Sequence, residues 1–243
     1  MITRRKVILG TGAVILAGCD SLTDSPVLLS ADDANLFLQR SVNGRAALAK
    51  QYRPDQRSPI FRVNGTANPD TAEYNGLAAN GFADWRLQVD GLVARPLSLS
   101  LAQLQSLPQR AQITRHDCVE GWSAIGKWQG PQLATLLRLA GLSDTARYIV
   151  FHCADRFGAS PYYESIDMVD AFHPQTIMAW ALNDRYLNIG HGAPVRLRVE
   201  RQLGYKHAKY VMRIQAVSSL AGIGGGKGGF WEDSNGYEWY AGI

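Results

Sequence analysis

One cysteine lies in a stretch rich in groups that take part in chemistry. The segment "TRHDCVEGWSAIGKW" places Cys118 between Asp117 and Glu120, with His116 two residues before it. A thiol in such a setting can pack in a core, form a disulfide, act as a nucleophile or, as the thiolate, bind a soft metal. The residue types alone leave these four roles open.

The other cysteines and the missing motifs limit these roles. The chain has three cysteines, and if Cys19 belongs to a leader, Cys118 and Cys153 are the remaining internal pair. No CxxC and no paired Cys/His spacing indicates a zinc or thioredoxin-like site. A serine-hydrolase elbow is missing, because "GWSAIG" has its second glycine one position too late. A hydrolase that pairs Cys118 with one of the five histidines stays open.

The N-terminus is typical of an exported protein. "MITRRKVILGTGAVILAGC" has a basic start, an apolar run over 7–17 and small residues before Cys19. Arg4 and Arg5 resemble a twin-arginine signal, the route of proteins that fold, often with a cofactor, before export. "LAGC" resembles a lipobox, so we expect a periplasmic protein that Cys19 anchors to the inner membrane when acylated. An ordinary cleaved signal with an incidental cysteine is the alternative.

Composition indicates one large domain behind this signal. The chain has 243 residues, 46% of them hydrophobic, enough for a substantial core. Its 25 Lys and Arg against 21 Asp and Glu are a modest excess spread along the chain, so we expect no nucleic-acid partner. We divide the chain into a signal over 1–18, a tether and N-terminal arm over 19–60, and an oxidoreductase domain over 61–243.

Several strands are expected around the cysteine segment, which itself reads as a polar loop. Alternation predicts a strand near 85–89, and an apolar run predicts a buried strand over 147–155. A hairpin is expected at 183–184 ("ND"), and two more strands within 193–220. Strands mix with short helices and long loops without regular βαβ alternation, so the predicted class is α+β.

Helices and loops are expected between these strands. A serine cap and Pro108 bound a short helix, and a second helix is expected over 131–141. The segment 61–81 is dense in Asn, Gly and Pro and predicts turns and loop. The glycine-rich tail lacks the Lys-Ser/Thr pair of a P-loop, because Gly228 follows Lys227, so we expect a turning tail pinned by its aromatic residues.

Four motifs in order carry a family resemblance. "NGT", "RHDCVEGWSAIGKWQG", "HGAPVRLRVERQLGYKHAKYV" and the terminal "GYEWYAGI" resemble the sulfite-oxidase family of molybdenum enzymes. Within that family the chain is most similar to exported bacterial catalytic subunits related to the periplasmic methionine sulfoxide reductases, over roughly residues 60–243. The resemblance implies a sulfite oxidase-like molybdopterin-binding fold with a mixed sheet.

The resemblance also assigns the site. It implies that the Cys118 thiolate binds molybdenum carried by one molybdopterin, which suits a soft ligand. An anionic phosphate and a pterin ring call for guanidinium, ammonium and backbone N–H groups. The matching positions that would hold the cofactor are Asn64, Ala67, Asn68, Cys153, His191, Arg196, His207, Ala208 and Lys209. Two of these positions differ from the methionine sulfoxide reductases, which have an asparagine in place of His191 and a threonine in place of Cys153.

The implied activity is oxygen-atom transfer, with reduction of S-oxides such as methionine sulfoxide as the leading hypothesis. Glu120 is the predicted proton carrier, with a structural role in the loop as its alternative. The chain has no C-x-x-C-H haem motif and no iron–sulfur cysteine set, so electrons require a partner, by resemblance a membrane b-type cytochrome. We expect a monomer. Sulfite-type oxidation, a non-catalytic molybdopterin-binding subunit and a metal-free thiol hydrolase are the rival readings.

Overall fold

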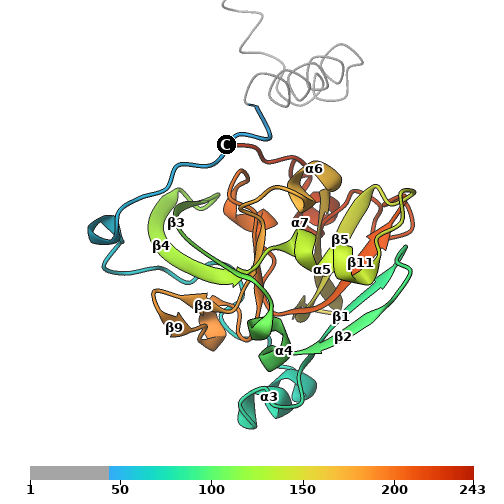
Figure 1. The fold of residues 1–243 in the computed structure, drawn as a ribbon, viewed down its shortest axis with the longest axis horizontal. Coiled ribbons are helices and arrows are strands. Elements are labelled where there is room, and N and C mark those ends of the chain that lie inside the picture. The colour runs from blue at the N-terminus through green and yellow to red at the C-terminus, as the bar shows by residue number, and fades with distance from the viewer. Residues whose placement is uncertain (1–43) are drawn as a thin grey trace, which may run out of the picture. The chain divides into compact units, whose positions relative to one another are not determined.

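The computed structural model describes residues 44–243, of which Arg45–Ile243 form one unit (Figure 1). The predicted signal and the predicted acylation site at Cys19 lie outside the described residues. Within 44–243, no helix is both long and apolar enough to cross a membrane.

A five-stranded mixed sheet forms one side of the described unit (Figure 1). Its order is β2-β1-β11-β5-β6, with β1 and β11 parallel and the other neighbours antiparallel. Apolar residues from alternate positions of β1 and a continuous run in β5 fill its core. The strands are β1 (Arg86–Gly91), β2 (Leu97–Ser100), β5 (Tyr148–Phe157), β6 (Ser160–Asp167) and β11 (Val211–Val217).

A second, antiparallel sheet with the order β3-β4-β8-β9 lies on the other side in Figure 1. It is dominated by one long hairpin of two ten-residue strands, and a short pair, β7 and β10, accompanies it. The strands are β3 (Gln109–Cys118), β4 (Trp122–Pro131), β7 (Ile177–Ala179), β8 (Ala181–Leu182), β9 (Arg185–Tyr186) and β10 (Arg196–Arg198).

The reading of the cysteine segment as a polar loop is therefore wrong. Only the tip between β3 and β4 is loop. Burial alternates along β3, but the buried, inward-facing residues carry polar groups, namely Gln112, Thr114, His116 and Cys118. A pattern search for apolar residues at every second position misses such a strand.

Short helices close the layers. Ser100 caps α4 through a capping box with Gln103, and Gly141 ends α5 in the left-handed region at φ 68°. These two helices and the hairpin turn at 183–184 agree with prediction. The segment 61–81 contains the helix α3, and α7 was not predicted. The helices are α3 (Ala72–Ala79), α4 (Leu101–Ser106), α5 (Leu133–Ala140), α6 (Met168–Ala171) and α7 (Phe230–Asn235).

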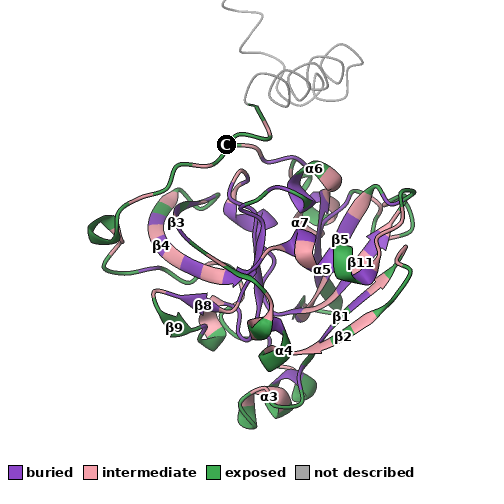
Figure 2. Ribbon diagram, in the orientation of Figure 1, coloured by how far each residue is buried: buried purple, intermediate pink, exposed green. Residues whose placement is uncertain are grey.

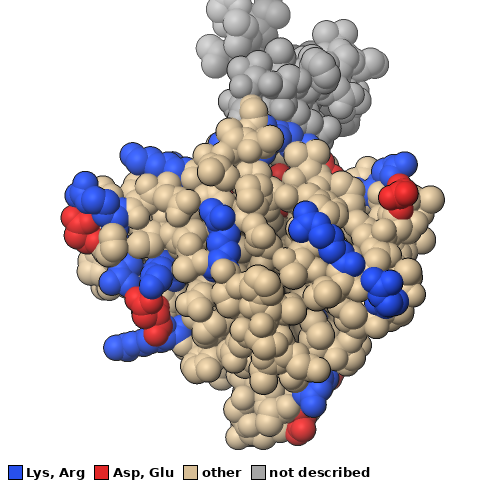
Figure 3. Space-filling view, viewed as in Figure 1, with Lys and Arg blue, Asp and Glu red and all other residues tan. Residues whose placement is uncertain are grey.

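Residues 45–60 run along this body and bond to it. Tyr52 N donates to Ile113 O at 2.9 Å, and Ser58 N donates to Ile125 O at 2.9 Å, so the segment follows both strands of the long hairpin. Buried residues concentrate in the central strands and the segments between the sheets (Figure 2). On the face drawn in Figure 3, lysine and arginine side chains are scattered rather than gathered in one patch.

Candidate functional site

Cys118 is held at the tip of the long hairpin. It is the last residue of β3 and pairs with Trp122 across a three-residue loop. Gly121 N donates to Cys118 O at 3.0 Å, and Gly121 has a φ of 84°, which a residue with a side chain rarely adopts. The hairpin thus turns Cys118 inward, on the same face as His116. Burial raises the pKa of the free thiol, and a bound metal would displace its proton.

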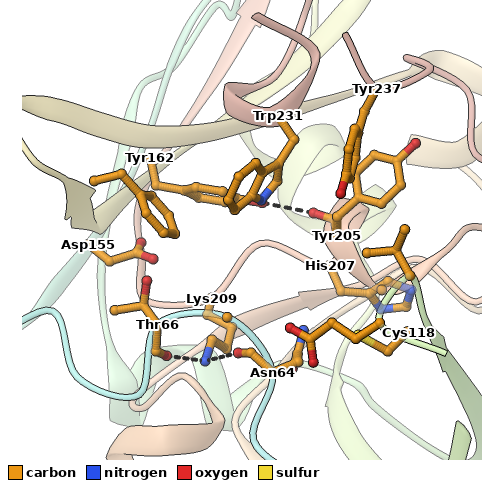
Figure 4. Close-up of a pocket in the computed structure, with 15 residues that line it drawn as sticks. Asn64, Thr66, Cys118, Asp155, Tyr162, Tyr205, His207, Lys209, Trp231 and Tyr237 are labelled. Carbon is orange, nitrogen blue, oxygen red and sulfur yellow. Dashed lines mark hydrogen bonds between the residues drawn. The ribbon is translucent and has the colours of Figure 1, made fainter. Parts of the chain in front are cut away.

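Cys118 opens into a pocket with two chemically different sides. Figure 4 shows Asn64, Thr66, Lys209 and Cys118 on one side and aromatic rings on the other. We call the aromatic side, made by Tyr162, Tyr205, Trp231 and Tyr237, the aromatic wall. The remaining lining residues are Gly65, Val119, Glu120, Asp155, Phe157, Gly204 and His207.

Lys209 ties the loop after Phe61 to the polar side. Its Nζ donates to Asn64 O at 2.7 Å, to Gly190 O at 2.9 Å and to Thr66 O. Burial, reinforced by the charge of Arg196, lowers the pKa of Lys209 to about 7. The ammonium is thus both a structural clamp and a poorly solvated charge at the edge of the pocket.

Arg196 lies behind this clamp and is fully buried. Its Nη1 donates to His191 O and its Nη2 to His207 O, both at 3.2 Å. Its guanidinium carbon lies 5.1 Å from the centroid of the Trp128 ring. His191 bonds to Phe61 O at 3.0 Å and Asn188 Oδ1 at 2.8 Å, so it supports the loop beside the pocket.

Two neutral histidines lie near Cys118, and of these His207 lines the pocket while His116 packs against it. The rings of His116 and His207 have centroids 5.1 Å apart. Burial, together with the charge of Arg198, holds the pKa of both well below the usual range. A Cβ on Gly204 would lie 2.6 Å from His116 Nε2, so this close approach requires glycine.

Five buried polar atoms in and around the pocket have no hydrogen-bond partner among the described residues. Asn64 Oδ1, Asp155 Oδ1 and His207 Nδ1 belong to residues that line it, and His116 Nε2 and Arg196 Nε belong to side chains that contact His207. Leaving such groups unpaired costs about 1–3 kcal/mol each in a folded protein. Acceptors and a donor left open beside a thiol indicate a place for a ligand that has many hydrogen-bonding groups.

Six of the predicted cofactor residues do not line this pocket, namely Ala67, Asn68, Cys153, His191, Arg196 and Ala208. Ala67 and Asn68 are exposed on the same loop as Asn64, and Asn68 Oδ1 accepts from Asp70 N at 3.2 Å. Ala208 is buried between two lining residues, and its carbonyl accepts from Leu197 N at 2.8 Å. Their predicted roles stay predictions.

Cys153 lies in a second cavity, beside His152, Tyr163 and Asp233. Its Sγ is 3.9 Å from Phe151 O, and burial raises its pKa well above the usual range. Both cysteines of the described chain are free, so the disulfide considered from the sequence is not formed.

The glycine-rich tail forms one wall of this second cavity. Gly225 N and Lys227 N donate to the two carboxylate oxygens of Asp233 at 2.7 and 3.0 Å, and Tyr163 donates to the same carboxylate at 2.5 Å. The glycines thus wrap the chain's own anion, which agrees with rejecting a phosphate loop.

Asp155 and the aromatic wall were missed by the sequence analysis. Asp155 is buried at the end of the apolar run of β5, and burial raises its pKa to about 6 despite a hydrogen bond to Thr66 and the charge of Lys209. An acidic residue that closes a buried strand was the available signal. The wall gathers aromatic residues from separate segments, which sequence spacing does not reveal.

The two acids flanking Cys118 are separated by the strand geometry. Asp117 faces away, accepting from Arg115 Nε at 2.9 Å and from Ser123 Oγ at 2.5 Å. Glu120 lines the pocket, and its Oε2 accepts from Trp122 Nε1 at 3.1 Å.

Comparison with known proteins identifies the family. The family described as "Oxidoreductase molybdopterin binding domain" matches residues 75–221. The chain belongs to this family. It is an oxidoreductase, as predicted, and the resemblance to sulfite oxidase-type molybdopterin enzymes is confirmed.

Two curated relatives share more than a third of their aligned residues with it. The protein named "Putative protein-methionine-sulfoxide reductase subunit YedZ1" from Azospira oryzae is 38% identical over 243 residues, covering 98% of this chain and 86% of that protein. The protein-methionine-sulfoxide reductase catalytic subunit MsrP from Ralstonia nicotianae is 37% identical over 168 residues, covering 65% of this chain and 50% of that protein.

The fold has a solved counterpart. The sulfane dehydrogenase SoxCD from Paracoccus pantotrophus superposes with a TM-score of 0.53 at 20% identity, over 72% of this chain and 46% of that one. The α+β class with a mixed sheet and a molybdopterin-binding fold is therefore confirmed.

The pocket residues fit a molybdopterin. The described residues hold no group of three or more His, Cys, Asp or Glu that could bind a metal. The pocket does offer one thiol, from Cys118, beside unpartnered polar atoms, and the buried guanidinium of Arg196 lies outside its lining, bonded to His207 O. A soft metal delivered with its own sulfur ligands, an N–H-rich ring and a phosphate matches that donor set.

Proposed function

We propose that this oxidoreductase binds one molybdenum-molybdopterin per chain and reduces S-oxides, with methionine sulfoxide as the leading substrate. The observation that carries the proposal is the thiol of Cys118 in a pocket edged by unpartnered buried polar atoms. The names of the two curated relatives support the substrate class. Cys118 would be the protein ligand of the metal.

Other residues would contact the pterin ring and the phosphate of the cofactor. Asn64, Arg196 and His207 have open polar atoms to offer the pterin and its phosphate, and Lys209 adds a positive charge. When bound, the cofactor supplies two-electron oxygen-atom transfer. The hydrogen bonds around the pocket would fix the position of the cofactor, above all those that Lys209 donates to three backbone carbonyls.

The overall reaction consumes protons as well as electrons. An S-oxide takes up two electrons and two protons, its S–O bond breaks, and a sulfide and water leave. Glu120 lines the pocket and reaches solvent, which suits the predicted role of carrying protons inward. His116 and His207 stay neutral through burial and serve as hydrogen-bonding groups near Cys118.

Electrons would come from a separate partner. Both curated relatives are named as subunits, which favours a multi-protein reductase, and a membrane b-type cytochrome is the proposed donor. The signal features of residues 1–18 support a periplasmic location. In this proposal Cys19 tethers the enzyme to the inner membrane, and its catalytic part works as a monomer.

A reduced-dye assay on molybdenum-containing protein tests the function. We expect oxidation of a reduced viologen with methionine sulfoxide and with simple sulfoxides, and no turnover without an S-oxide. Molybdenum-loaded protein that reduces no S- or N-oxide would favour a non-catalytic binding subunit instead. The same protein would also be assayed for oxidation of sulfite with an electron acceptor. The pocket disfavours it, because no arginine lines the pocket within 44–243 to hold a sulfite anion.

A further inference from the structure

The aromatic wall offers ring surface rather than charged groups. Its rings face the polar side across the pocket (Figure 4). The Tyr205 and Tyr237 ring centroids are 5.1 Å apart, and Trp231 stacks on Tyr237 at 5.9 Å with 27° between the planes. These three rings form a continuous apolar surface beside the reaction site.

The polar ends of two tyrosines in this wall are already bonded to the protein. Tyr162 donates its hydroxyl to Tyr205 O at 2.8 Å, and Tyr205 donates its own to Glu238 O at 2.6 Å. What these side chains offer a ligand is therefore their ring surface rather than a hydroxyl.

A buried ion cluster fixes the wall in position. Lys206 Nζ lies 2.5 Å from Glu232 Oε1 and also pairs with Glu164, and all three side chains are buried. Lys206 follows Tyr205 in the chain, and Glu232 follows Trp231. The cluster thus joins the two segments that carry the rings, so the surface is formed before a substrate arrives.

The charges of the pocket favour a neutral substrate. The one lysine that lines it, Lys209, already donates to three carbonyls. Glu120 and Asp155 line the pocket as acids, and no arginine of the described chain does. Because the proposed function assigns the charge of Lys209 to the cofactor, an anionic substituent of a substrate would be desolvated here without a free cation to pair with.

We propose that Tyr205, Trp231 and Tyr237 form a subsite for the apolar substituent of a neutral sulfoxide and so set the enzyme's specificity. The inference rests on the proposed S-oxide reduction and names the substrate class it selects. Carbon atoms next to a sulfoxide sulfur carry partial positive charge, and aromatic faces attract them.

The test compares matched ligands on the molybdenum-loaded full chain. Methyl phenyl sulfoxide and its para-carboxylate have the same reacting group and differ in one charge, and methyl phenyl sulfone serves as a non-reducible ligand for calorimetric titration. Trp231→Ala removes one of the three rings, and Trp231→Phe restores an aromatic face. Trp180→Ala is the matched control, because Trp180 lines a different cavity beside Tyr186.

We expect Trp231→Ala to weaken sulfone binding about tenfold and to lower kcat/KM for the neutral sulfoxide by a similar factor, with little change for the carboxylate. Trp231→Phe and Trp180→Ala should stay near wild type. Tyr237→Ala gives the same comparison if Trp231→Ala does not fold.

Unchanged sulfone affinity in metal-loaded Trp231→Ala, or equal losses for both sulfoxides, would overturn the subsite. Failure of the proposed function looks different. Wild-type protein with full molybdenum would then reduce neither sulfoxide, while sulfone binding would still report on the aromatic wall.

Discussion

The two free cysteines lie in two cavities that differ in how their polar groups are satisfied. Of the side chains that line the pocket of Cys118, those of Asn64, Asp155 and His207 each leave a buried polar atom unpaired. None of the side chains lining the cavity of Cys153 does so within the described residues. The contrast teaches that a ligand site is recognised by unmet hydrogen-bonding capacity rather than by the presence of a cysteine or by cavity size.

The second cavity shows how a site-like motif can be satisfied internally. Asp233 takes up the N–H groups that the glycine-rich loop would otherwise offer to an anion, and His152 bonds to Gln215 at 2.9 Å. Matched substitutions in the two cavities should therefore give different results. Those in the pocket of Cys118 should cause loss of cofactor, and those in the cavity of Cys153 should lower stability only.

The largest effect is expected from Lys209→Met. It removes two hydrogen bonds to the loop carrying Asn64 and Thr66 and one to Gly190 O, and we expect cofactor affinity to fall about hundredfold. Molybdenum content and the fluorescence of released pterin measure it. Lys227→Met is the control, because Lys227 is exposed and uses its backbone N–H on Asp233. Equal cofactor loss in both variants would remove the difference between the cavities.

A pH effect on stability is expected from Asp155. Its folded pKa of about 6 exceeds the ordinary value of 3.8, so the folded protein keeps a proton that the unfolded chain has released. The contribution of Asp155 to the free energy of unfolding of cofactor-free protein should therefore decrease by about 2 kcal/mol as pH rises from about 4 to 6, whereas the lowered pKa values of His116 and His207 act with the opposite sign.

Asp155→Asn should remove that decrease, as urea unfolding at several pH values would measure. Asp233→Asn, in the second cavity, should leave it in place, because the pKa of Asp233 is lowered and its effect has the opposite sign. A pH profile identical in Asp155→Asn and wild type would contradict the assignment.

Within the hairpin, Glu120→Gln and Asp117→Asn sharpen the comparison between its two faces. We expect Glu120→Gln to lower kcat about tenfold with molybdenum retained, because Glu120 lines the pocket. Asp117→Asn should keep kcat, since Asp117 pairs with Arg115 on the other face. Steady-state kinetics with a sulfoxide decide it. An unchanged kcat in Glu120→Gln would mean that Glu120 carries no protons and has only its structural hydrogen bond with Trp122.

The smallest effect is expected from Asp233→Asn. An amide accepts less well from three donors than a carboxylate does, so the free energy of unfolding should fall by about 1 kcal/mol with cofactor content unchanged. Asp144→Asn, at an exposed position, serves as the control in denaturant titrations. Loss of molybdenum from Asp233→Asn would contradict the separation of the cavities.

The sequence predicted the fold where local rules operate. Apolar periodicity located β1 and β5, capping located α4 and α5, and turn residues located the hairpin at 183–184. The family resemblance, rather than periodicity, supplied the class of site. It brought together Asn64, Cys118, His207 and Lys209, which all line one pocket.

The remaining features depend on long-range packing. β3 escaped prediction because its inward residues are polar, and two of them bond to distant groups, Gln112 to Glu200 at 2.9 Å and His116 to Arg198 at 2.8 Å. The aromatic wall draws rings from four places along the chain. The place of Cys153 in the second cavity follows from the register of β5 against β6, which shifts just after His152.

Molybdenum content of matched cysteine variants tests the central claim most directly. Wild type, Cys118→Ala and Cys153→Ala would be purified as folded full chains and analysed for metal. We predict about one molybdenum per chain in wild type and in Cys153→Ala, and none in Cys118→Ala. A full complement of molybdenum in Cys118→Ala, or its loss from Cys153→Ala alone, would contradict the assignment of the Cys118 pocket as the metal site.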